Sequence, residues 1–192
     1  LSTIGSVRMV REAKSRGIRV TAEVCPHHFS LTEEAVRGFN THAKMSPPLR
    51  TWRDVQAVKD GLRDGTIDVI ATDHAPHAVQ DKQQQFAAAP NGIVGLETAL
   101  PLTLALVDEG VLSLESAVAK LTCEPARAFG LPKGSLAPGA DADVVVVDTE
   151  ESWEVDPARF RSKSRNTPFA GWKVKGRVRT TLVAGRVVYE GH

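Results

Sequence analysis

The stretch that most constrains the fold is IDVIATDHAPH, residues 67–77. It opens with the apolar residues Ile67, Val69 and Ile70, and so short a run between a glycine turn and a proline is typical of a strand buried on both faces. Asp73 and two histidines follow at once. Because parallel α/β proteins bind ligands at the carboxyl ends of their strands, this stretch predicts an active-site rim. The alternative is that Asp73 caps a turn and the histidines are surface residues.

Helical and strand patterns alternate through the first 130 residues. Residues 2–16 have apolar side chains at helical spacing and end at Gly17, and residues 18–24 are typical of a strand that ends in Cys-Pro-His-His. A short helix is predicted from Thr32, a loop over 40–50 around two prolines, and a helix from Thr51 with Trp52 on its apolar side. This order predicts α/β architecture.

Residues 78–129 contain a polar segment followed by predicted helices. Residues 78–89 are polar and rich in glutamine, which predicts a mobile loop or a broken helix over the site. Residues 93–107 are apolar almost all round, as in a buried helix, and shorter helices are expected over 113–120 and 125–129.

The character of the chain changes at Gly134, after which Gly, Pro and Asp cluster. A β-branched run follows at 144–147, and residues 174–189 alternate between basic and apolar side chains with a hairpin turn at Ala184-Gly185. We therefore expect two parts, residues 1–130 and residues 131–192, the second a small β unit.

Charge and cysteine content narrow the classes of function. The formal net charge is +1, so no global field favours nucleic acid or a membrane surface, and neither is expected as a partner. Cys25 and Cys123 are far apart and form no CxxC pair, which favours free thiols in the cytoplasm over a disulfide framework.

Histidines gather at the ends of the two predicted strands. Five of the six lie before residue 80, and four of these are at strand ends: His27, His28, His74 and His77. Imidazoles beside a carboxylate suit a divalent metal such as zinc, and Asp73 could then take a proton from water and return it to a leaving nitrogen. The chain has no HxH or HExxH pair. An α/β domain whose histidines only make hydrogen bonds is an equal alternative on spacing alone.

Several motifs in order carry a more specific signal. They are TAEVCPHHFSLTEE, AKMSPPLR, ATDHAPH, APNGIVGLETAL and NTPFAGW. Together they resemble consecutive signatures of class I dihydroorotase, in the amidohydrolase superfamily. The resemblance implies the carboxyl-terminal portion of a distorted (β/α)8 TIM-like barrel over 1–130, followed by part of a small β-sandwich domain over 131–192. It also implies reversible, zinc-dependent hydrolysis of dihydroorotate to carbamoyl aspartate, in pyrimidine synthesis.

The resemblance also implies roles for particular residues. The metal-linked catalytic aspartate of the family falls on Asp73, and the histidine that binds the substrate carboxylate falls on His77. The loop whose backbone meets the substrate ring falls on Asn91 and Gly92, where glycine permits close approach of the main chain.

At two further positions the correspondence with the family is less direct. The family usually has asparagine where this chain has Ser46, and a shorter hydroxyl would bind the substrate weakly or through water. His28 matches a histidine that we interpret as lying behind the metal ligands or in the pocket wall, with a structural role as the alternative.

The family's HxH pair, bridging carboxylate and two further metal histidines would all fall upstream of Leu1. We therefore expect one or two zinc ions whose remaining ligands lie upstream, and a chain that corresponds to part of an enzyme and is inactive alone.

Other functions stay open. Another cyclic amidohydrolase, a hydantoinase or an allantoinase, is one alternative. A non-catalytic subunit that scaffolds aspartate transcarbamoylase is a second, and a short binding module without chemistry is a third. The candidate partners are dihydroorotate and carbamoyl aspartate, aspartate transcarbamoylase, and further copies of the chain.

Overall fold

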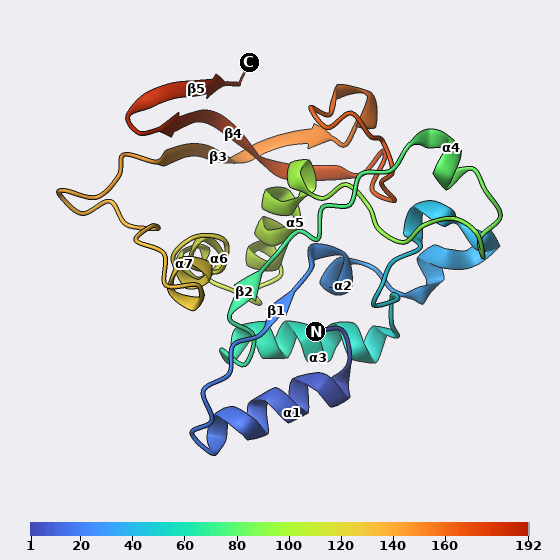
Figure 1. Cartoon of the computed structure of the whole chain (residues 1–192), viewed down its shortest axis with the longest axis horizontal. Helices are drawn as coiled ribbons and strands as arrows, with labels where there is room; N and C mark the ends of the chain where they lie inside the picture. The colour runs from blue at the N-terminus through green and yellow to red at the C-terminus, as the bar shows by residue number, and fades with distance from the viewer. Residues whose placement is uncertain (192) are drawn as a thin grey trace.

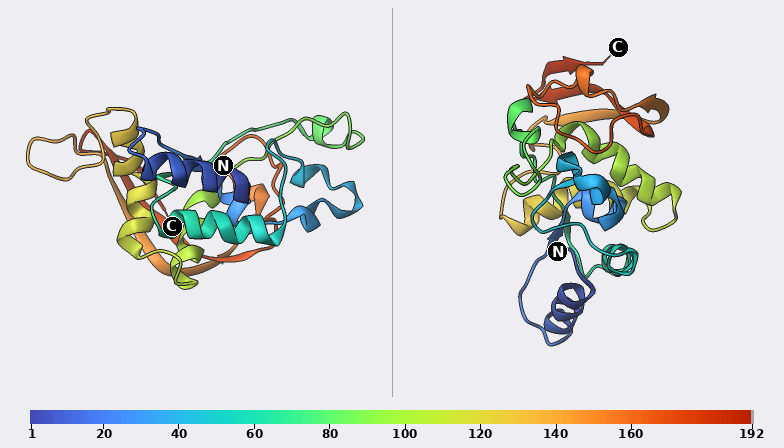
Figure 2. Two further views of the ribbon diagram at one scale, coloured as in Figure 1. Left: turned by 90° about the horizontal axis from the view of Figure 1, so that it is seen from below. Right: turned by 90° about the vertical axis from the view of Figure 1, so that its right-hand side faces the viewer.

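A computed structural model describes residues 1–191, so the expected second part is described as far as residue 191. The elements form layers (Figure 1): the carboxyl-terminal sheet at the top, a buried helix beneath it, two short parallel strands at the centre, and two helices below. The side view in Figure 2 shows the same order. The described residues are α/β as expected, whereas closure of a barrel stays a prediction.

The two lower helices begin at side-chain caps. Helix α1 (Ile4–Ser15) starts at Thr3, whose hydroxyl accepts a hydrogen bond from the backbone N–H of Ser6. Helix α3 (Trp52–Arg63) starts at Thr51, which is capped in the same way by its bond with Asp54. The prediction for Trp52 is wrong, because its side chain is 66% exposed: it occupies the first turn, before the apolar stripe reaches the core.

The central strands are β1 (Glu23–Val24) and β2 (Val69–Ile70), which pair in parallel with Glu23 opposite Val69. Parallel pairing and burial of β2 confirm the expected buried strand. The strand predicted over 18–24 was too long: it is reduced to two residues because the segment before Ala22 bonds to no neighbouring strand among the described residues, and Ile18 is exposed.

Short helices and turns fill the segment between β1 and α3. Helix α2 spans Pro26–Ser30, and the 3-10 helices η1 and η2 span Glu33–Phe39 and Thr41–Ala43. The helix predicted from Thr32 is therefore of the 3-10 type, and it is broken at Gly38, whose φ is 72°. The loop predicted over 40–50 is confirmed over 44–50, whereas η2 occupies its first part.

After β2, the polar segment contains one short helix, α4 (Val79–Lys82), and then turns. The buried helix is α5 (Leu96–Asp108), as predicted, and the shorter α6 (Leu114–Leu121) and α7 (Cys123–Ala128) follow it. Among residues 1–191, no helix is both long and apolar enough to cross a membrane.

The last layer is a three-stranded antiparallel sheet in the order β3-β4-β5, with the bounds Val144–Glu154, Lys173–Val183 and Arg186–Glu190. The short 3-10 helix η3 (Pro157–Arg159) follows β3. The predicted hairpin turn is confirmed: Ala184 and Gly185 both have positive φ, as a tight two-residue turn requires. One layer of a sandwich is thus described, and the sandwich itself stays a prediction.

One hydrophobic core joins these layers. It includes Phe29 and Ile67 from the first part of the chain, Leu106 from α5, and Val155 and Phe169 from the second part. The core therefore crosses residue 130, and the division into two domains there remains a prediction.

Candidate functional site

The candidate site lies where loops meet beyond the carboxyl ends of β1 and β2. The segments are residues 25–28 after β1, 44–47 in the proline-rich loop, 72–77 after β2, and 90–92 before α5. Direct backbone bonds connect the loops: the N–H of Gly92 donates to the carbonyl of Lys44 at 2.9 Å.

Asp73 lies at the end of the strand that the sequence singled out. Its φ is 49°, a left-handed conformation that Asp tolerates better than most residues, and its side chain is exposed. The pKa of the Cys25 thiol is raised to about 12, first by burial and next by the negative charge of Asp73. The charge of Asp73 therefore acts on Cys25, the residue that follows β1.

His77, Asn91 and Gly92 lie together in the structure, and their implied roles toward a substrate stay predictions. The imidazole Nε2 of His77 donates to the carbonyl oxygen of Asn91 at 2.7 Å. Gly92 has a φ of 110°, and a Cβ there would lie 2.4 Å from the Cβ of Ala75. Only glycine meets both conditions, so the loop passes close over the segment that follows Asp73.

Two buried polar residues that sequence reasoning missed hold this loop. The Nζ of Lys82 donates to the carbonyls of Pro90 and Gly92 at 2.9 and 3.1 Å. The amide of Asn166 donates to the carbonyls of Ala75 and Gly92, at 2.9 and 3.2 Å. Asn166 belongs to the NTPFAGW motif, which indicates the family but does not indicate that Asn166 holds the loop at Gly92. Lys82 lies within the polar stretch that predicted a mobile loop or a broken helix.

The segment over 83–90 is tied down as well. The Nζ of Lys44 donates to the carbonyls of Phe86, Ala87 and Ala89 at 2.7, 3.1 and 2.5 Å. Three convergent carbonyls around one ammonium group hold this loop in a single conformation.

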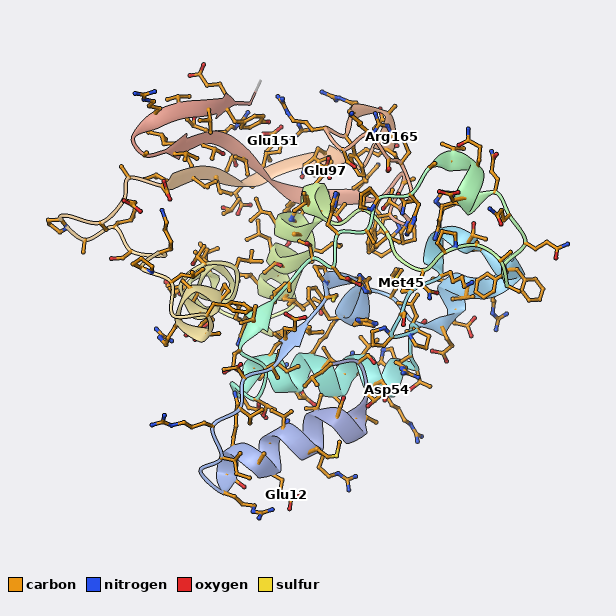
Figure 3. The ribbon with its side chains drawn as sticks, viewed as in Figure 1. Glu12, Met45, Asp54, Glu97, Glu151 and Arg165 are labelled. Carbon is orange, nitrogen blue, oxygen red and sulfur yellow. The ribbon has the colours of Figure 1, made fainter. Side chains whose placement is uncertain are left out.

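Ser46 and His28 lie beside one another along the rim. Met45, labelled in Figure 3, is buried in the core, and the next residue, Ser46, is exposed toward solvent. The Nε2 of His28 donates to the carbonyl of Pro47 at 2.9 Å, so the histidine braces the loop that presents Ser46. This contact supports a bracing role for His28 and leaves its implied place behind the metal ligands a prediction.

The first histidine of the ATDHAPH motif, His74, bonds to the start of α5. The Nδ1 of His74 accepts hydrogen bonds from the backbone N–H groups of Gly95 and Leu96, at 3.1 and 3.4 Å, at the start of α5. For His74 the hydrogen-bonding alternative therefore holds. His74 lines a cavity of about 740 Å³ between α5 and the sheet, whose other walls include Glu97, Trp153, Arg177 and Tyr189. The predicted site residues lie outside that cavity.

Comparison with known proteins identifies the family. A model described as the amidohydrolase family matches residues 6–188. The chain belongs to the amidohydrolase family. This amidohydrolase chain is similar to the dihydroorotases of Syntrophus aciditrophicus (57% identical over 190 residues) and Pelotomaculum thermopropionicum (59% over 191). Each match covers 99% of this chain and 45% of the relative, so the chain spans less than half the length of the curated relatives it matches.

Solved structures agree with this fold. The L-hydantoinase from Arthrobacter aurescens matches with a TM-score of 0.92 at 35% identity, over 99% of this chain and 44% of that one. The dihydropyrimidinase from Brevibacillus agri matches with a TM-score of 0.93 at 26% identity, over 99% and 43%. Both are similar in fold to the layers described above.

The described residues fit a metal site only in part. A zinc site needs about four donors, and the exposed carboxylate of Asp73 supplies one at the strand end. Cys25, His27 and His28 form a separate cluster whose ligand atoms lie within 4.8 Å of one another. The sequence marked His27 as part of a strand-end cluster but did not pair it with Cys25.

Proposed function

We propose that this chain is the carboxyl-terminal part of a cytoplasmic, zinc-dependent dihydroorotase. The observation that carries the proposal is the rim itself: Asp73 at the end of β2, with His77 bonded to the carbonyl of Asn91 above the constrained Gly92. The identity of 57% and 59% to two dihydroorotases over nearly the whole chain supports the substrate class. The two cysteines are free, which supports a reducing compartment.

The residues of this chain have distinct tasks in that reaction. Zinc, when bound, acts as a Lewis acid and makes water nucleophilic near neutral pH. Asp73 would be one of its ligands, with the others in the part of the enzyme that this chain does not span. Asp73 accepts the proton of the attacking water and delivers it to the ring nitrogen as the amide bond breaks.

The other loops of the rim bind the substrate. His77 supplies a donor to the carboxylate of dihydroorotate once its Nε2 exchanges the carbonyl of Asn91 for the substrate. Ser46 supplies its hydroxyl, and the backbone of Asn91 and Gly92 meets the ring. Lys82 and Asn166 hold the carbonyl of Gly92 from behind, so the loop is set before the substrate arrives. Such preorganisation lowers the entropic cost of reaching the reactive geometry.

A chimera tests the proposal. The matching segment of the Syntrophus aciditrophicus dihydroorotase is replaced by residues 1–192, and zinc-dependent hydrolysis of dihydroorotate is measured. We expect activity, and we expect Asp73→Asn to lower kcat by about 10²- to 10⁴-fold. Glu12→Gln, on the exposed α1 far from the rim in Figure 3, is the matched control and should leave kcat unchanged. An Asp73→Asn chimera with full turnover would contradict the proposal.

The same chimera separates the alternatives. The structural match to an L-hydantoinase makes a hydantoinase the second candidate, and hydrolysis of hydantoin or allantoin in preference to dihydroorotate would select it. A folded chimera that hydrolyses none of the three would favour the scaffold for aspartate transcarbamoylase. We expect residues 1–192 alone to be inactive, and zinc-dependent turnover by that chain would overturn this expectation.

A further inference from the structure

Three metal-ligating side chains lie together at the first turn of α2. Cys25 precedes the helix, and His27 and His28 are in it. One potential ligand atom from each residue lies within 4.8 Å of the other two. Donors around a tetrahedral zinc ion lie about 3.5 Å apart, given bonds of about 2.3 Å to sulfur and about 2.0 Å to nitrogen. The limit of 4.8 Å exceeds this spacing by about 1.3 Å, so the three side chains must draw together when a metal ion binds.

Both imidazoles have a buried nitrogen without a partner. His27 is 2% exposed and His28 is 4% exposed. Within residues 1–191, the Nε2 of His27 and the Nδ1 of His28 have no hydrogen-bond partner. Buried polar atoms are normally paired, and an orphaned one calls for an explanation such as a bound ion.

The hydrogen bond of His28 sets the state of its ring. Because Nε2 donates to the carbonyl of Pro47, Nδ1 carries the lone pair in the neutral ring. A backbone carbonyl that accepts from the far nitrogen is the usual outer support of a metal-binding histidine. The cluster therefore holds one imidazole in the tautomer that coordinates through Nδ1.

The charges that act on the cluster are of both signs: Asp73 and Glu23 are negative, whereas Arg50 and the terminal ammonium group of Leu1 are positive. The imidazole of His27 is buried, and burial, and next His28, lowers its pKa to about 3. The thiol of Cys25 has its pKa raised first by burial and then by the charges of Asp73 and Glu23. The carboxylates that oppose a thiolate attract a metal cation, so the metal can displace the thiol proton.

We propose that Cys25, His27 and His28 form a second metal site, for a thiophilic divalent cation such as Zn²⁺ or Cd²⁺. On binding, the S–H bond of Cys25 breaks, a sulfur–metal bond forms, and one proton leaves to solvent. The fourth position stays open to water. This site does not include Asp73, and it does not depend on the proposed hydrolysis.

Titration of Cd²⁺ into metal-free residues 1–192 tests the site. We expect one equivalent to produce the ultraviolet charge-transfer band of a cadmium thiolate, with release of one proton per metal ion. Cys25→Ser should abolish the band. Cys123→Ser removes the other free, half-buried cysteine and should retain it. A band that survives Cys25→Ser, or that disappears in Cys123→Ser, would overturn the proposal.

Two further variants separate the ligands from their surroundings. His27→Gln removes a direct ligand and should lower the affinity for Cd²⁺. The loss of an outer support costs roughly 10- to 100-fold in metal affinity, and we expect His27→Gln to cost more. Asp73→Asn should keep the band, and its loss there would assign the metal to the Asp73 centre instead.

A measurement on the unsubstituted chain covers the case in which a variant misfolds. The ¹¹³Cd chemical shift distinguishes sulfur and nitrogen donors from oxygen donors. A resonance in the range of one sulfur and two nitrogen ligands supports the site, and an oxygen-only resonance contradicts it.

Discussion

At the scale of single residues, the rim depends on polar groups buried where apolar side chains would be expected. Lys82 is 3% exposed and Asn166 is 2% exposed, and each bonds to the carbonyl of Gly92. Packing alone cannot direct a carbonyl, whereas a buried donor can, because an unpaired buried oxygen is costly. The geometry of the predicted substrate loop thus depends on residues far from it in sequence.

Lys82 should make stability depend on pH. Burial, and next the charge of Lys44, lowers its pKa from 10.5 to about 8. Between these values the unfolded chain holds a proton that the native chain has lost, so this group makes the free energy of unfolding rise with pH from about 8 to about 10.5. Urea unfolding across that range should show the rise in the free energy of unfolding. Lys82→Met should remove the part of this rise that Lys82 contributes. The exposed Lys163→Met is the control, and an equal change in both variants would contradict the assignment.

Gly92 should tolerate no side chain. Gly92→Ala combines a φ of 110° with a Cβ at 2.4 Å from Ala75, and we expect it to lower the free energy of unfolding by about 1–3 kcal/mol. Gly17→Ala is the control, since its φ is 73° but no atom lies within 4 Å of the added Cβ. Urea unfolding should show the larger loss for Gly92→Ala. Equal losses would mean that backbone conformation, not contact with Ala75, makes this glycine necessary.

At the scale of elements, α1 and α3 are joined through their first turns. Asp54, labelled in Figure 3, bonds to the Thr51 cap, and its Oδ1 also accepts from the backbone N–H of Ile4 at 2.9 Å. The carboxylate of Asp54 thus caps the start of α3 and binds the start of α1. Val7 of α1 and Val58 of α3 belong to the same hydrophobic core. Arg11 of α1 pairs with Asp64, which ends α3, at 2.7 Å.

Removal of that carboxylate should cost more than removal of its neighbour. We expect Asp54→Ala to lower the free energy of unfolding by about 1–2 kcal/mol, because the cap and the bond to α1 are both lost. Asp60→Ala, on the same helix, removes an exposed pair with Arg63 and should change stability by less than about 0.5 kcal/mol. Chemical denaturation of both variants measures the difference, and a similar small effect in each would show that the cap is dispensable.

At the scale of the whole molecule, the two predicted parts share one hydrophobic core, and hydrogen bonds from Asn166 connect the second part to the first. Val155 and Phe169 pack with residues from before β2, and Asn166 bonds to Ala75 and Gly92. These contacts favour unfolding as one unit.

Residues 1–192 should therefore unfold in a single cooperative transition. Far-ultraviolet circular dichroism reports mainly the helices, whereas tryptophan fluorescence includes Trp153 and Trp172 of the second part. Coincident transitions are expected because a shared core cannot be lost on one side alone. Two separated transitions would instead support independent domains that divide near residue 130.

Sequence alone determined the features that depend on neighbours along the chain. Helices α1 and α3, the turn at Ala184-Gly185 and the buried β2 follow from short-range bonds and apolar spacing, and the ordered motifs indicated the family. Tertiary structure decided what depends on distant segments: the positions of Lys82 and Asn166, the turn of His74 toward α5, and the exposure of Trp52. The reason is that a buried polar group is placed by its partners, and a linear pattern does not contain partners that lie tens of residues away.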